Sequence, residues 1–154
     1  MTALAALGTG WLVEHWPFGQ QRWLSAKERA VYAAAIRHAI GHKHPDGVIF
    51  VSIARNDPPA SLIGQALLPV SRSHTVEGVD RQGYYSSRFC DKYTREPGWI
   101  LYAKILGWEA NDRVRVIIQW TTSPDVGAGE AIYLRLKNGE WTYDGDDPDS
   151  AYDI

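Results

Sequence analysis

The sequence predicts an α+β fold, in which an N-terminal helix packs on a curved, mainly antiparallel sheet that ends in a four-strand meander. Three observations predict it. Residues 99–143 show sustained alternation of apolar and polar side chains, broken by turn residues. A capping pattern at Ser25 precedes apolar residues at helical spacing. Residues 47–54 form a continuous apolar run with the length and β-branched content of a buried strand, which we expect to join the meander in one sheet.

The meander contains four predicted strands, at residues 99–108, 113–121, 130–136 and 140–143. Asn138-Gly139 lies between alternating runs and predicts a type I′ hairpin turn, because both central residues of that turn have positive φ. The turn sets three cross-strand pairs, which are Lys137 with Glu140, Leu136 with Trp141 and Leu134 with Tyr143. A turn at residues 109–112 likewise sets Ile105 near Val116, Ala103 near Ile118 and Leu101 near Trp120, which we expect to form the core face.

The opposite face of the meander combines basic and large apolar side chains. Its candidate binding residues are Tyr102, Trp108, Arg113, Arg115, Tyr133 and Arg135, accompanied by Lys104, Leu106, Ile117 and Lys137. Two interpretations stay open: the N-terminal segments cover part of this face while the cations are solvated at its rim, or the face binds a partner.

The predicted helix begins after Ser25, with Glu28 completing the capping box, and continues to Ile40, where Gly41 is the expected stop. Three histidines follow at spacings compatible with a metal site, namely His38, His42 and His44. Asp46 is the one nearby carboxylate that would complete such a site, and no cysteine does. Polar and cationic side chains at a helix C-terminus complement the helix dipole, so we predict no metal site here.

The remaining chemistry-bearing residues are scattered. The weak catalytic candidates are Asp57, His74 and Asp80. A short apolar helix is expected at residues 60–68, closed by Pro69. Residues 70–97 sustain no period, although their mixture of basic and aromatic residues is also compatible with stacking on nucleic-acid bases. Tyr85, Phe89 and Tyr93 fit one side of a short helix, which is the simpler interpretation.

Size and composition are those of one soluble domain at residues 1–143, followed by an acidic tail at 144–154 that we expect to be flexible. Two alternatives stay open for the tail: it mimics a polyanion and binds a basic partner, or it folds back onto the basic face. A net charge of -2 argues against a chain-wide nucleic-acid footprint. Cys90 is the single cysteine, which excludes an intrachain disulfide. The apolar stretch at residues 3–13 lacks a preceding cation and is shorter than the roughly 20 residues that a bilayer requires. We therefore expect a cytoplasmic location, no membrane and no cofactor.

The order of helix, strand, short helix and closing meander, ending in Leu136-Lys-Asn-Gly-Glu-Trp141, resembles small bacterial domains of the NTF2-like or cystatin-like kind. The resemblance covers mainly residues 99–143 and concerns layout. The chain shows one strong N-terminal helix where NTF2-like domains usually have more, and no family catalytic residue can be carried over.

Two functions follow as hypotheses. The first is a non-catalytic protein-binding module, for example a bacterial immunity or inhibitor protein, whose partner is another protein and not nucleic acid. The alternative is a small-molecule enzyme or carrier with a pocket between helix and sheet, which would use Asp57, His74 or Asp80 as acid or base.

Overall fold

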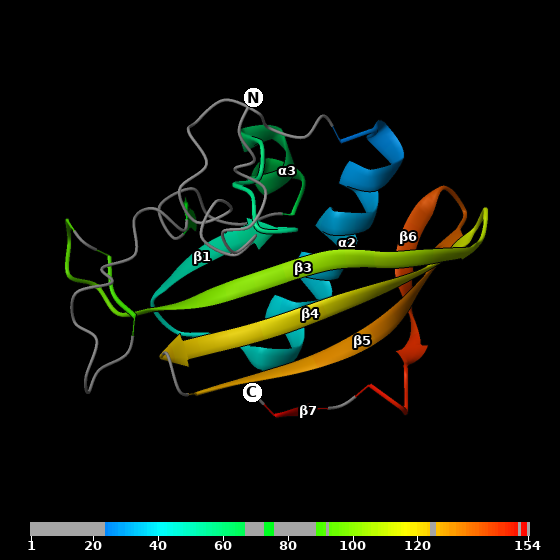
Figure 1. Cartoon of the computed structure of the whole chain (residues 1–154). Helices are drawn as coiled ribbons and strands as arrows, with labels where there is room; N and C mark the ends of the chain where they lie inside the picture. Colours follow the sequence, from blue (N-terminus) through cyan, green and yellow to red (C-terminus); the bar gives the residue numbers. More distant parts are fainter. Residues whose placement is uncertain are drawn as a thin grey trace, which may run out of the picture.

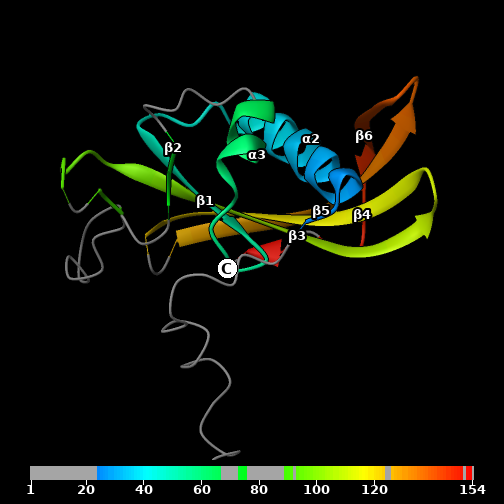
Figure 2. The same cartoon turned by 90° about the horizontal axis from the view of Figure 1, so that it is seen from above.

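The computed structural model describes residues 24–66, 73–75, 89–91, 93–123, 126–150 and 152–153. Within these residues, two helices lie on one face of a twisted sheet (Figures 1 and 2). The helices are α2 (Ala26–Lys43) and α3 (Ala60–Gln65). The strands are β1 (Val48–Ile53), β2 (Ser73–Thr75), β3 (Gly98–Ala110), β4 (Arg113–Ser123), β5 (Val126–Lys137), β6 (Glu140–Asp146) and β7 (Tyr152–Asp153). The α+β class is therefore confirmed.

No helix in the described part of the chain is long and apolar enough to span a membrane.

Helix α2 begins as the sequence predicts. The Ser25 Oγ accepts a hydrogen bond from the Glu28 amide at 3.1 Å, and the Glu28 carboxylate accepts one from the Ser25 amide at 2.8 Å. The helix does not stop at Gly41, however. It continues to Lys43 and ends at His44, whose φ of 49° is left-handed. The expected stop was wrong because a glycine costs only about 1 kcal/mol inside a helix, and the capping conformation falls on a histidine instead.

Strand β1 is buried along its whole length and lies between β2 and β3, with both of which it runs parallel. The strand order is β2-β1-β3-β4-β5-β6, and β7 pairs with β5. The prediction that residues 47–54 form a buried strand in the same sheet as the meander is confirmed. A strand buried on both faces favours apolar residues throughout, and Ser52, the one polar residue of β1, is buried with them.

The predicted registers of the meander are confirmed. Leu101, Ala103 and Ile105 lie opposite Trp120, Ile118 and Val116. In the second hairpin Leu134, Leu136 and Lys137 lie opposite Tyr143, Trp141 and Glu140. Asn138 and Gly139 have φ values of 52° and 83°, as a type I′ turn requires. The core between this sheet and α2 contains Tyr32, Ile36, Leu101, Val114, Val116, Ile118, Ile132 and Leu134.

A β-bulge in β3 changes the expected direction of Trp108. Ile105 lies opposite Val116, whereas Gly107 lies opposite Arg115, so β3 uses one extra residue between these pairs. One inserted residue reverses the alternation that follows it. Trp108 consequently pairs with the buried Val114 and lies on the helix-covered face. The expectation that Trp108 belongs to the opposite face was wrong.

The described residues after Tyr143, which are 144–150 and 152–153, lie against the sheet. β6 extends to Asp146, so it crosses the boundary that the sequence predicts at residue 143. The Asp147 amide then donates to the Ala131 carbonyl oxygen at 2.9 Å, and the Ala131 amide donates to the Ser150 Oγ at 2.9 Å. β7 pairs with Ala128 and Gly129 of the same strand. This arrangement matches the alternative interpretation, in which the acidic segment folds back onto the sheet.

The segment between α3 and β3 also differs from expectation. β2 lies within the stretch where no element was predicted. Cys90 forms a bridge with Pro97, and the Asp91 carboxylate accepts from the Tyr93 and Thr94 amides at 2.9 and 2.8 Å, which fixes a tight turn. Phe89 and Tyr93 therefore do not share a helix. Tyr85 lies outside the described residues.

Candidate binding surface

Four of the six predicted binding residues form a compact group on the face of the sheet opposite α2. Arg113 lies opposite Arg135, and Arg115 lies opposite Tyr133, on the adjacent strands β4 and β5. Their neighbours in sequence, among them Val114 and Leu134, are buried on the helix side, so alternation directs the four away from the core. We call Arg113, Arg115, Tyr133, Arg135 and Lys137 the basic group.

Asp144 of β6 neutralises much of the basic group. Its carboxylate accepts from the Arg113 Nε at 3.3 Å, the Arg135 Nε at 3.1 Å and the Lys137 Nζ at 3.3 Å. The hydrogen bond from Arg135 is the largest of the effects that hold the pKa of Asp144 below its usual value. The same hydrogen bond, together with the charge of Asp144, raises the pKa of Arg135. One carboxylate therefore ties three cations from two strands to β6.

Other carboxylates complete the pairing. Arg113 also contacts Glu109 at 2.6 Å, Arg135 contacts Asp112 at 3.2 Å, and Arg115 forms an ion pair with the buried Asp147. The Arg113 guanidinium lies 4.0 Å from the centre of the Tyr133 ring. Desolvation, followed by the charge of Asp147, raises the pKa of the Tyr133 hydroxyl. Each of the four cations thus has an acidic partner within this chain, and the group does not present an uncompensated positive surface.

The other two predicted binding residues lie elsewhere. Tyr102 is half-buried in β3, where it pairs with Ser52 on one side and Gln119 on the other. Trp108 lies across the sheet from the basic group, as described above. The structure therefore brings together four of the six predicted residues and separates Trp108 from them.

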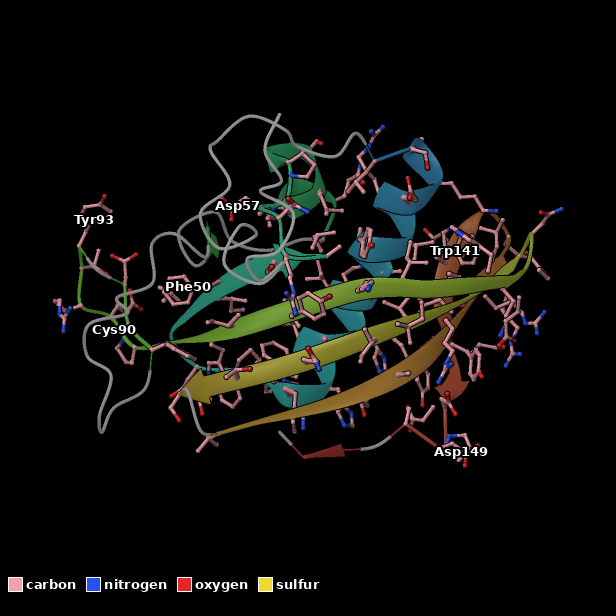
Figure 3. All side chains as sticks on the ribbon, viewed as in Figure 1. Phe50, Asp57, Cys90, Tyr93, Trp141 and Asp149 are labelled. Atoms are coloured by element: carbon pink, nitrogen blue, oxygen red, sulfur yellow. The ribbon has the colours of Figure 1, made fainter. Side chains whose placement is uncertain are left out.

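Trp108 belongs to an aromatic cluster that the sequence did not predict. Its ring meets the Trp141 ring edge-on, with centroids 5.7 Å apart and planes inclined by 68°. The ammonium of Lys27, from the first turn of α2, lies 4.1 Å from the Trp108 ring centre and 5.9 Å from that of Trp141. Figure 3 shows Trp141 at the β6 end of the sheet and Tyr93 at the opposite end. The cluster thus joins the start of the helix to both meander hairpins.

Exposed apolar side chains gather on these two hairpins. Of the six large apolar side chains that are exposed in the described part of the chain, five belong to the strands of these hairpins. Apart from Val126 at the start of β5, they are Leu106, Trp108, Leu136 and Tyr143. Trp108 is 41% exposed and Leu136 is 37% exposed, although Leu136 lies directly opposite the buried Trp141. We call Trp108, Leu136, Trp141 and Tyr143, which share the helix-covered side of the sheet, the aromatic patch.

Histidines border the aromatic patch. The His38 ring stacks on Tyr143 with centroids 4.2 Å apart, and His42 stacks on His38 at 6.0 Å. Burial is the main cause that lowers the pKa of His38, against the opposing charges of Glu130 and Asp146. The Tyr143 hydroxyl donates to the Asp146 carboxylate at 2.7 Å, a hydrogen bond that chiefly raises the pKa of Tyr143 to about 12.

This histidine pair exists because α2 continues past Gly41, which places His38 and His42 one turn apart on the same helix. Within the part of the chain that the structure describes, no three His, Cys, Asp or Glu side chains are grouped closely enough to hold a metal ion.

The weak catalytic candidates occupy separate positions. Asp57 follows the end of β1 in the loop before α3 (Figure 3), whereas the backbone of His74 in β2 lies beside Phe50, in the middle of β1. Asp80 lies outside the described residues. The described part of the chain thus shows no common site for these three residues.

Comparison with known proteins gives no relative. No family model, no curated protein and no solved structure matches the chain. The resemblance to NTF2-like or cystatin-like domains therefore stays a prediction.

Proposed function

We propose that the chain is a non-catalytic protein-binding module and that the aromatic patch is the centre of its binding surface. The observation that carries the proposal is the half-exposed pair Trp108 and Leu136 above the buried Trp141. Residues that dominate binding energy in protein interfaces are enriched in Trp and Tyr, which provide large contact areas at low conformational entropy cost.

The surroundings of the patch fit the same function. Lys27 and Asp146 lie at its border, in contact with Trp108 and Tyr143, and the neutralised basic group lies on the other side of the same hairpins. A protein interface generally has an apolar centre and a polar rim that carries both signs of charge. Nucleic acid would instead require cations that are free to meet phosphates, and the cations of the basic group are paired within the chain.

An inhibitor or immunity protein is the narrower form of this proposal. Such a protein acts by occupying a partner's surface stoichiometrically and needs no catalytic group of its own. It requires a rigid contact surface, and the aromatic patch lies on two paired hairpins held against α2.

The test is affinity capture with matched baits. The wild-type chain is compared with three variants. The patch variant combines Trp108→Ser with Leu136→Ser, and the basic-group variant combines Arg113→Glu with Arg115→Glu. The control, Tyr93→Ser, removes an aromatic ring that is 80% exposed at the opposite end of the sheet. Circular dichroism verifies that each variant is folded. We expect a stoichiometric partner to be lost only with the patch variant. Loss with Tyr93→Ser and retention with the patch variant would contradict the location, and recovery of no specific protein by any bait would contradict the function.

A further inference from the structure

β6 is an edge strand of the sheet. It closes the strand order at one end, and within the described residues β5 is the strand with which it pairs. Figures 1 and 2 show β6 bending toward the side of α2 at this end of the molecule. An edge strand leaves a row of backbone N–H and C=O groups to which a further strand can bind.

The hairpin register identifies which backbone groups face outward. The Leu136 amide donates to the Asp112 carbonyl oxygen at 2.8 Å, on the β4 side of β5. Leu136 and Trp141 therefore form a pair without mutual hydrogen bonds, and the N–H and C=O of Trp141 point away from β5. Tyr143 is two residues further along and lies opposite Leu134, so its backbone N–H and C=O also point away from β5. The outward groups thus belong to two residues of the aromatic patch.

The charge along this edge is negative. Residues 140–150 include five acidic residues and no Lys or Arg. Asp144 and Asp147 pair with arginines, but within the described part of the chain no cation forms an ion pair with Glu140, Asp146 or Asp149. Glu140 lies opposite Lys137, but the Lys137 ammonium bonds Asp144 instead. Glu140 and Asp146 therefore place negative charge on β6, the strand that carries the outward backbone groups.

Side-chain alternation determines what an added strand would meet. Trp141 and Tyr143 point to the helix side, whereas Glu140 and Thr142 point to the other side. A second copy of β6 fits this pattern poorly, because antiparallel pairing centred on Thr142 would place Glu140 opposite Asp144 of the other copy, and like charges directly opposite each other are destabilising. The edge instead suits a strand whose cationic side chains alternate with apolar ones.

We propose that β6 is the docking edge of this binding module and that its occupant is an extended segment of another protein, in which Lys or Arg alternates with apolar residues. The proposal rests on the proposed function and deepens it, because it names the partner's chemistry. Backbone hydrogen bonds to Trp141 and Tyr143 provide affinity, apolar side chains of the partner contact the aromatic patch, and its cations meet the carboxylates of the edge.

The test titrates the ¹⁵N-labelled chain with a synthetic peptide of alternating Lys and Val, and with a control peptide in which Glu replaces each Lys. We expect the Lys peptide to shift the Trp141 and Tyr143 amide signals and to slow their hydrogen exchange, while the Glu peptide does neither. Glu140→Lys should weaken binding roughly fivefold, from the usual energy of a cross-strand charge pair. Glu96→Lys makes the same charge change at an exposed site on the far side of the sheet and should leave binding unchanged.

The outcomes separate the two proposals. Equal binding of the Lys and Glu peptides, or shifts that avoid β6, would overturn the docking edge. If affinity capture still depended on Trp108 in that case, the binding function would stand and its partner would contact the patch through side chains alone. If capture recovered nothing specific while the Lys peptide bound β6, the docking edge would be correct, whereas the proposed function as a module for a protein partner would be contradicted.

Discussion

The contact between Lys27 and Trp108 provides a direct test of the bulge in β3. The Lys27 ammonium lies 4.1 Å from the Trp108 ring centre, inside the roughly 6 Å limit for a cation–π interaction. Both side chains are exposed, so we expect a coupling free energy of about 0.5–1 kcal/mol. Regular alternation without the bulge would turn Trp108 to the opposite face and abolish this coupling.

A double-mutant cycle isolates the coupling from other effects. Trp108→Leu also removes the edge-on contact with Trp141, which contributes about 0.5–1.5 kcal/mol beyond area burial. Lys27→Met also removes a positive charge from the first turn of α2, where the helix dipole disfavours it. Urea unfolding of the wild type, both single variants and the double variant, followed by far-UV circular dichroism, gives the non-additive term alone.

The control cycle combines Trp108→Leu with Lys43→Met. Lys43 is exposed at the other end of α2, so its cycle measures the background. Distant sites normally add to within about 0.3–0.5 kcal/mol. A Lys27 coupling no larger than the Lys43 value would refute the placement of Trp108 on the helix side, and with it the composition of the aromatic patch.

Three further predictions test other parts of the fold. Ser25→Ala should lower the free energy of unfolding by about 1 kcal/mol in urea unfolding, because it removes the side-chain cap of α2, whereas Ser25→Thr should retain most of it. Gly98→Ala should lower it by about 1–3 kcal/mol, because the added Cβ would lie 2.5 Å from a backbone oxygen of β1, while Gly64→Ala, with nothing within 4 Å, should not destabilise. Since burial lowers the pKa of His38 below 6.5, the unfolded chain takes up a proton at higher pH than the folded chain, and stability should fall as the pH drops below 6.5. His38→Phe should flatten this decline relative to the wild type and to the exposed-site control His44→Gln, and an unchanged pH slope would contradict the prediction.

The parts of the fold that could be predicted are those determined by local chemistry. Asn138-Gly139 fixes its hairpin because few other residues adopt positive φ at two successive positions. The alternation of the flanking strands then selects the register, since a slip of one residue would bury Lys137 and expose Leu134. The sequence of β1, apolar except for Ser52, likewise required burial on both faces.

The bulge and the helix end depend on information beyond the local pattern. An isolated glycine inside a strand can indicate a bulge, and Gly107 is such a glycine. The sequence around it fits a strand with a bulge as well as one without, so the pattern does not decide the face of Trp108. Gly41 has open space around it, so nothing forces the chain to turn there, and α2 continues until His44 takes the left-handed conformation. Both differences changed the candidate site, because one moved Trp108 and the other stacked His42 on His38.

The basic group shows that a strand pattern can place side chains on the right face without showing whether their charges are paired. Arg113, Arg115 and Arg135 lie together as the strand pattern predicts, but their partner Asp144 is 31 residues from Arg113 along the chain. Continuing the predicted hairpin by one more pair would place Asp144 opposite Tyr133, within this group, so the compensation was implicit in the register. The positive charge on these strands is therefore paired with carboxylates of the same chain. Among the described residues, Glu140 and Asp146 of β6 form no ion pair with a cation, which is why the proposed partner is cationic.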